Sequence, residues 1–160
     1  MLLSYLPLLR GWQWQAVDVD IPFAIAPGGE RTMGEADYDG WFWSAMCAMN
    51  NADGEFALGY YDAAGAWRTA TLGPKGLYGA GLTSPNPTGI WCSRYDTANS
   101  IYVVTYGSYL PLPFQKRYKL SIRAPSGSAL TILGYTHLLI EILDPDKFRA
   151  SLQELLGKVR

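Results

Sequence analysis

The chain has 160 residues and a formal net charge of −1; hydrophobic residues make up 49% of it and charged residues only 17%. This length favours one domain with a sizeable core, and the near-neutral charge gives no electrostatic case for nucleic acid or an anionic membrane. The charged share lies below the usual ~25%, which indicates a surface partly covered by another subunit or partner. Aromatic residues at 14%, with 17 glycines and 10 prolines, are typical of an all-β fold.

The N-terminal segment, residues 1–10, is apolar but differs from a secretory signal peptide. It has no basic leader, Pro7 interrupts it, and no small-residue cleavage site follows. It is also far shorter than the ~20 residues of a membrane-spanning helix. We therefore expect no targeting or transmembrane segment here, but an arm that packs on its own core or on a neighbouring subunit. Its interface candidates are Leu2, Leu3, Tyr5 and Leu6.

Residues 11–25 predict the first strand region, in which the apolar face changes side. Trp12 and Trp14 share one parity, whereas the apolar residues from Val17 to Ile25 share the other. Such a change near Ala16 is expected at a bulge or where a strand changes sheets. Residues 27–29, Pro-Gly-Gly, end the region, and the polar segment 30–40 predicts a loop.

Residues 41–72 predict a β-meander. The strand over 41–49 is apolar on both faces, so both faces should be covered. A strong turn signal over 50–54 leads to a hairpin partner at 56–61, and a turn over 62–65 leads to a short strand at 67–72. The glycine- and proline-rich segment 73–89 then predicts a long loop, of the kind that is usually functional or an interface. Its interface candidates are Leu77, Tyr78 and Leu82.

Two further strand pairs are predicted after this loop. Residues 90–95 and 101–106 should pair across a turn at 96–99, and the proline-containing segment 109–113 suits an edge or a crossing between sheets. Residues 113–143 then predict a β-hairpin that closes an antiparallel sheet, with alternating polarity to Arg123, a turn at 124–128 and a second run that is apolar on both faces. The interface candidates here are Tyr109, Leu110 and Leu112.

The C-terminal residues 144–160 predict a helix. Asp144 is a good N-cap and Pro145 suits the first helical position. The helical stripe consists of Phe148, Leu152, Leu155, Leu156 and Val159. We therefore predict a mainly β chain: an arm (1–10), an antiparallel, jelly-roll-like β-sandwich (11–143) of about eight to ten strands, and one C-terminal α-helix (144–160) packed on it.

The side chains that could carry chemistry form no catalytic pattern. His137 is the only histidine, has apolar neighbours, and stands near no nucleophile motif, so we interpret it as a structural histidine. Cys47 and Cys92 lie among apolar residues and predict buried free thiols, although a disulfide between them stays open. We predict no enzyme activity and no cofactor.

Two groups of charged residues leave alternatives open. The pairs Asp18/Asp20 and Asp37/Asp39 could bind calcium or act as an acid/base pair, but turn-forming, solvent-facing acids are the simpler interpretation. A run of cations could form a patch for an acidic partner, but a solvated strand face that discourages edge pairing is favoured, because the whole chain is not basic. That run consists of Lys116, Arg117, Lys119 and Arg123.

Aromatic residues could stack on sugar rings if their faces are exposed beside polar groups. The same residue types are equally common in protein interfaces, and the sequence does not show which of them are exposed. The sugar-stacking candidates are Trp41, Tyr61, Trp67 and Trp91.

Residues 56–67, the glycine-rich loop and residues 113–122 resemble jelly-roll proteins of viruses and bacteriophages. The shared order is a strand ending in an Asp/Gly turn, a long loop, and a Pro-Phe-x-Lys strand that leads to a terminal strand; the likeness covers roughly residues 40–143. Such proteins are mostly structural, so the resemblance implies a non-enzymatic virion or assembly subunit that works by self-association. The alternative is a carbohydrate-binding or lectin-like β-sandwich.

Overall fold

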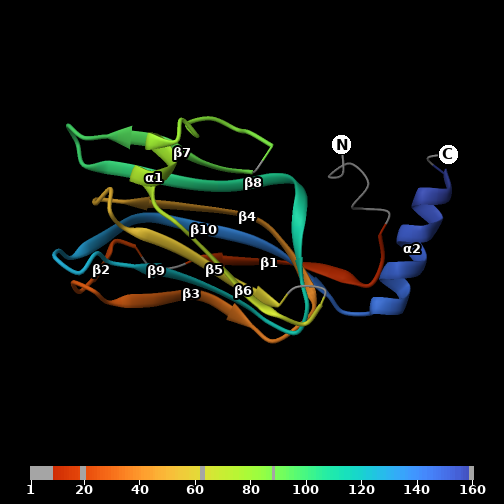
Figure 1. Ribbon diagram of the computed structural model, residues 1–160. Helices are drawn as coiled ribbons and strands as arrows, with labels where there is room; N and C mark the ends of the chain where they lie inside the picture. Colours follow the sequence, from red (N-terminus) through yellow and green to blue (C-terminus); the bar gives the residue numbers. More distant parts are fainter. Residues whose placement is uncertain (1–8, 19–20, 62–63, 88, 159–160) are drawn as a thin grey trace.

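The computed structural model describes residues 9–18, 21–61, 64–87 and 89–158, without the side chains of residues 16–18, 36, 108–112 and 158. As predicted, the chain is an antiparallel β-sandwich with a C-terminal helix, which lies at one end of the sandwich (Figure 1). Sheet A contains β1 (Trp12–Asp18), β2 (Phe23–Ile25), β4 (Gly40–Met49), β7 (Ile90–Asp96), β8 (Ile101–Phe114) and β10 (Leu130–Ile142). Sheet B contains β3 (Glu30–Ala36), β5 (Glu55–Tyr61), β6 (Trp67–Leu72) and β9 (Tyr118–Arg123).

The strands pair in a nested order. β1 pairs with β10, β3 with β9, β4 with β8, and β5 with β6. Successive pairs alternate between the two sheets, so the chain winds as one long hairpin rolled into a sandwich, as in a jelly roll. The resulting strand orders are β1-β10-β4-β8-β7 in sheet A, with β2 also on β10, and β3-β9-β5-β6 in sheet B.

The segment predicted as a loop over residues 30–40 instead contains β3, which pairs with β9 at the edge of sheet B. The apolar pattern of β3 is weak in the sequence because one face carries Glu30, Thr32 and Glu35. Met33 is its large buried apolar side chain, with 5% of its surface exposed. An edge strand with one solvent-exposed face therefore resembles a polar loop in sequence.

The predicted hairpin over residues 113–143 is also wrong. β9 lies in sheet B between β3 and β5, whereas β10 lies in sheet A between β1 and β4. The turn over 124–128 therefore carries the chain from one sheet to the other. Local turn chemistry does not distinguish such a crossing from a hairpin, because both begin and end at well-formed strands.

Two shorter segments also differ from expectation. The first strand region has no bulge near Ala16, and it does not cross to another sheet. β1 ends at Asp18, β2 begins at Phe23, and both strands pair with β10. The loop over 73–89 contains a short helix, α1 (Pro74–Gly79), which begins with the proline suited to a first helical turn.

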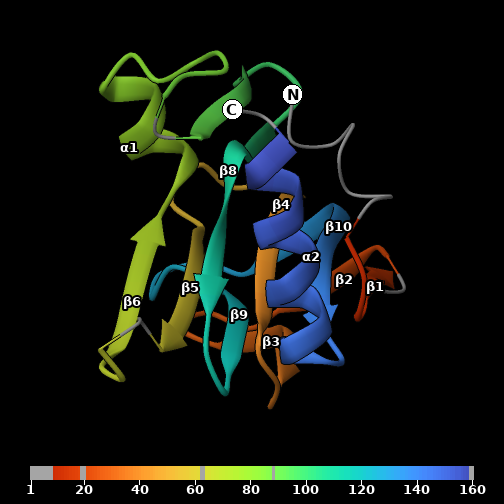
Figure 2. The same ribbon diagram turned by 90° about the vertical axis from the view of Figure 1, so that its right-hand side faces the viewer.

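The main core fills the space between the sheets, and its fully buried side chains include Phe42, Met49, Leu120, Ile122 and Leu139. A second apolar cluster lies outside sheet A, where α2 (Pro145–Lys158) covers one end of it. Figure 2 shows α2 in front of the ends of β4 and β10. This cluster contains Leu9, Trp43, Ile140 and Phe148, with Leu152 and Leu155 packed against it.

The start of α2 matches its predicted cap. The Lys147 N–H donates to Oδ1 of Asp144 over 3.0 Å, and Pro145 is the first helical residue. The stripe predicted from the helical spacing packs inward at Phe148, whereas Leu156 stays 59% exposed.

Removing the Phe148 ring should destabilise the whole domain. Phe148 is 5% exposed and meets the Trp41 ring edge-to-face with centroids 5.1 Å apart. We expect Phe148→Ala to lower the free energy of unfolding by about 3 kcal/mol, because it leaves a cavity between α2 and sheet A. The matched control on the same helix, Leu156→Ala, should change it by less than about 0.5 kcal/mol. Urea unfolding measures both, and equal effects would show that α2 does not depend on this contact.

Candidate functional site

The two outer faces of the sandwich differ in chemistry. Because side chains alternate along a strand, every second residue of each sheet points away from the core. In sheet B the outward side chains are mostly charged or hydroxyl-bearing, whereas on β4, β8 and β10 of sheet A the described ones carry no charge.

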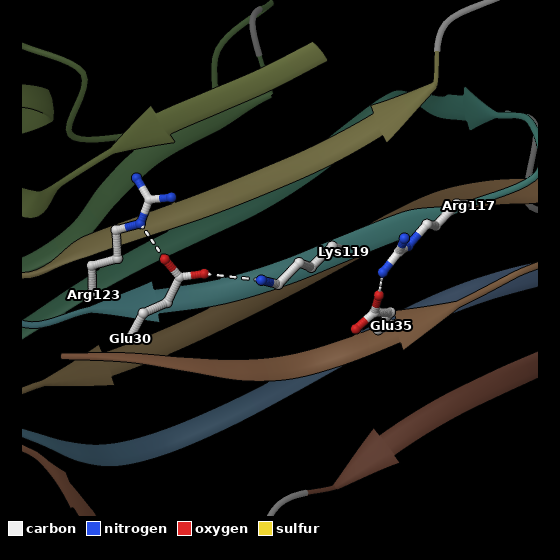
Figure 3. A network of polar contacts seen from close by, with 5 residues as sticks. All are labelled: Glu30, Glu35, Arg117, Lys119 and Arg123. Carbon is white, nitrogen blue, oxygen red and sulfur yellow. Dashed lines mark hydrogen bonds and ion pairs between the residues drawn. The ribbon is translucent and has the colours of Figure 1, made fainter. Parts of the chain in front are cut away.

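An ion-pair network crosses the outer face of sheet B between β3 and β9 (Figure 3). The Glu30 carboxylate accepts hydrogen bonds from Nε of Arg123 over 2.7 Å and from Nζ of Lys119 over 3.2 Å. These bonds and one from the Ser121 hydroxyl, with Arg123 contributing most, lower the pKa of Glu30 to about 2. Glu30 is therefore a fixed anion at neutral pH.

The remaining cation of this face also has acidic partners. Arg117 forms an ion pair with Glu35, and its Nε lies 3.6 Å from a carboxylate oxygen of Asp37. The outward cations of the predicted basic run are thus paired with carboxylates of β3 or the residue just after it. Because β9 is a central strand, these cations do not guard a sheet edge, which corrects that part of the sequence-based interpretation.

A trough of about 130 Å³ opens beside this network on the same face. Its floor is made of the buried small residues Ala57, Gly59 and Ser121. Trp67 and Thr69 of β6 stand on one side, and the Glu30, Lys119 and Arg123 network stands on the other. The trough exists because β5 carries small outward residues between two strands with longer ones.

Of the four sugar-stacking candidates, Trp67 lines this trough and Tyr61 packs against Trp67. The rings of Tyr61 and Trp67 lie 4.9 Å apart at 70°, and Trp67 is 41% exposed. Trp41 instead packs edge-to-face on Phe148 beneath α2. Trp91 lies on the other sheet, with its ring 3.2 Å from the position of a β-carbon at Gly107.

Lys119 and Arg123 of the trough belong to the predicted basic run, whereas its remaining polar and small residues were not predicted from the sequence. Glu30 fell within the expected loop, and the small residues Ala57, Gly59 and Ser121 carry no recognisable signal on their own. The available clue was the alternation of Glu30 and Thr32 with Arg31 and Met33, which is weak over so few residues.

On the outer face of sheet A, the described outward side chains of the three central strands carry no charge. Trp14, Met46 and Leu133 are each 39% exposed on this face, and Trp14 packs edge-to-face on Trp43 with centroids 5.7 Å apart. The outward residues of these strands are Trp41, Trp43, Ser44, Met46, Ala48, Ile101, Val103, Thr105, Gly107, Thr131, Leu133, Thr136, Leu138, Ile140 and Ile142. At the β7 edge, Arg94 and Asp96 neutralise each other across 2.7 Å.

The predicted interface residues have different locations. Leu77 is buried in the main core and Leu82 packs against it, so Leu77 is not available to a partner. Tyr78 is 50% exposed and stacks on Tyr95 with centroids 4.2 Å apart. Tyr109, Leu110 and Leu112 belong to β8 but their side chains lie outside the described part, as do residues Leu2, Leu3, Tyr5 and Leu6 altogether.

A cleft of about 260 Å³ lies between α2 and the adjoining ends of β4 and β8. Trp41, Phe148 and Leu152 give it apolar walls. Two polar groups at its rim already have partners: Asp39 accepts the Lys116 N–H over 2.7 Å, and Arg149 lies 3.5 Å from Asp146. We therefore interpret the cleft as a gap in the packing between α2 and sheet A, and not as a ligand site with converging polar groups.

His137 is buried between the sheets, with 1% of its surface exposed. Its Nδ1 lies 2.7 Å from the Tyr135 hydroxyl and its Nε2 lies 3.3 Å from the Tyr118 hydroxyl. A neutral ring offers one donor and one acceptor, so one tyrosine accepts and the other donates. Gly34 leaves room for the ring, because a β-carbon there would lie 2.9 Å from Nε2. His137 therefore ties the two sheets together inside the core.

The cysteines and the aspartate pairs give no metal site in the described structure. Cys47 and Cys92 are free and buried, as predicted, and burial raises the pKa of Cys47 to about 12. Asp37 and Asp39 bond to Arg117 and to the Lys116 backbone, while Asp20 and the Asp18 side chain lie outside the described part. Among the residues that the structure does describe, no three His, Cys, Asp or Glu side chains group closely enough to hold a metal ion.

The chain matches no protein-family model and no curated protein. Within the described ranges, the structure has no helix with the length and apolar character needed to cross a membrane. Function is therefore inferred from the chemistry of the two outer faces.

The buried His137 should make stability depend on pH. Burial lowers its pKa from 6.5 to about 4, so between these values the unfolded chain binds a proton that the folded chain does not. The free energy of unfolding should therefore fall as the pH is lowered through this window, by roughly 3 kcal/mol when complete. Urea unfolding at several pH values measures this loss in the wild type, and His137→Gln should lack it. The same pH dependence in both proteins would contradict the assignment.

Proposed function

We propose that this chain is a non-enzymatic assembly subunit that associates with copies of itself through the outer face of sheet A. One observation carries the proposal: the described outward side chains of β4, β8 and β10 carry no charge, and Trp14, Met46 and Leu133 are substantially exposed on this face. Exposed apolar side chains that gather on one uncharged face of a folded chain commonly mark an interaction site.

A second copy is the partner that best fits an uncharged face. A two-fold symmetric contact brings the same patch together from both subunits, so a charged patch would set like charges against each other. The described outward side chains of the three central strands are uncharged, so two copies of this face would not repel each other. Thr105 and Thr136 can add hydrogen bonds at the contact without introducing a charge.

The size of the face is compatible with a stable contact. Sheet A as a whole, five strands at a spacing of about 4.8 Å with roughly seven residues each at about 3.3 Å, spans approximately 550 Å², and α2 covers one end of it. Specific interfaces bury about 800 Å² of accessible surface per partner. Accessible surface follows the side chains, so that of a sheet face is larger than its flat area. Trp14, 39% exposed on β1 and packed edge-to-face on Trp43, extends the exposed apolar area toward the β1 edge.

We further propose that the assembly is a virion or bacteriophage particle. Support comes from the nested strand pairing together with the resemblance of residues 40–143 to jelly-roll proteins of viruses and bacteriophages. His137 is 1% exposed in the core and so cannot meet a molecule at the surface, which supports a non-enzymatic role.

Placing a charge at the centre of this face should weaken self-association. Met46→Lys and Leu133→Lys change side chains that are 39% exposed, so each lysine can reach water in the free subunit and the fold should persist. In the assembly the ammonium groups would be desolvated and face each other, so we expect association to weaken at least about tenfold. Sedimentation velocity over a range of protein concentrations measures this change.

The control for this experiment is Thr71→Lys, which places the same charge on the exposed outer face of sheet B. It should associate like the wild type. A wild type that stays strictly monomeric at high concentration, or variants that associate as well as it does, would overturn the proposal.

A further inference from the structure

We infer that the outer face of sheet B holds a binding site for a neutral pyranose sugar, formed by the Trp67 ring and the trough beside it. The inference goes beyond the proposed assembly role and does not depend on it, because the two faces lie on opposite sides of the sandwich (Figure 1).

The Trp67 ring is exposed and held in place. It lies over Gly59, where a β-carbon would come within 3.0 Å of Cε2 and 3.1 Å of Cη2. The Tyr61 ring supports it edge-on, with centroids 4.9 Å apart. A fixed aromatic surface can stack on the C–H face of a sugar ring with little further loss of side-chain freedom.

Hydrogen-bonding groups line the trough beside this ring. Among the described residues, Glu30 is the shared partner of Lys119 and Arg123. An ammonium has three N–H donors and a guanidinium five, so each cation keeps donors for a ligand. The hydroxyl of Thr69 stands on the Trp67 side and can both donate and accept. Stacking on one side and polar groups on the other is the arrangement that a ring with an apolar face and hydroxyl edges requires.

The charges favour a neutral sugar over an acidic one. Glu30 stays ionised beside Lys119 and Arg123, so a sugar carboxylate that approaches these cations would meet its repulsion. Hydroxyl groups avoid this cost, because they can donate to Glu30 and accept from Lys119. A polyphosphate or nucleic acid is disfavoured for the same reason.

The dimensions of the trough admit one sugar ring in part. The trough measures about 130 Å³, which is the volume of roughly four water molecules at about 30 Å³ each. This is below the 300–1,000 Å³ of an enclosed small-molecule pocket. We therefore expect one sugar ring to lie partly inserted and to bind with millimolar affinity.

A glycan array carrying neutral and acidic glycans, followed by saturation-transfer difference NMR with the bound monosaccharide, tests the inference. The wild type should bind neutral glycans. Trp67→Ala should reduce the affinity at least about tenfold, because it removes the stacking surface. Gly59→Ala should also weaken binding by displacing the ring. Tyr78→Ala, which removes a similarly exposed aromatic far from the trough, should bind like the wild type, and circular dichroism checks that each variant is folded.

Three results would overturn the inference: no binding to any neutral glycan, binding of acidic glycans alone, or undiminished binding by folded Trp67→Ala. If Trp67→Ala does not fold, Gly59→Ala and Lys119→Ala decide the question in its place, since both must weaken binding. Sedimentation of the same samples keeps this outcome separate from self-association.

Discussion

The rest of the structure depends on one requirement: β10 must be covered on both faces. Leu130, Ile132 and Leu139 point toward sheet B and are fully buried, with His137 hydrogen-bonded among them. On the other side, Ile140 is fully buried under α2, whereas Leu133 at the opposite end of the strand stays 39% exposed. The chain thus covers the second face of its central strand at only one end. The proposed interface lies on this outer face, on the part that α2 leaves exposed.

The solvent-facing sides of the two sheets differ in charge, which suits them to different roles. Sheet B satisfies its outer charges internally, with Glu30 bonded to residues of β9 that are 89 and 93 positions away in sequence. Exposed ion pairs of this kind add little stability, but they fix the side chains that border the trough. Sheet A instead leaves an uncharged surface whose burial would be favourable. A subunit built this way can bind its own copies with one face and keep the other free for a ligand.

The sequence was sufficient for features that depend on local chemistry or strong periodicity. Asp144 and Pro145 locate the start of α2, and the apolar environments of Cys47, Cys92 and His137 predict their burial. It was insufficient where pairing partners are distant. The sequence of β3 resembles a loop because the partners of its charged side chains lie on the distant strand β9. The turn before β10 crosses between the sheets, but no residue in it distinguishes it from a hairpin turn. The trough escapes prediction for the same reason, since four strands must be placed side by side before its small floor residues form a depression.

The central claim, that copies associate through sheet A, is tested most directly by the oxidation rate of Met46. This side chain is 39% exposed at the middle of the face, whereas Met33 and Met49 are buried and serve as internal references. Hydrogen peroxide oxidises accessible methionine, and mass spectrometry locates the product. We predict that Met46 oxidation slows as the protein concentration rises and the subunits associate. An unchanged Met46 rate in a sample that has associated would place the interface elsewhere and contradict the account.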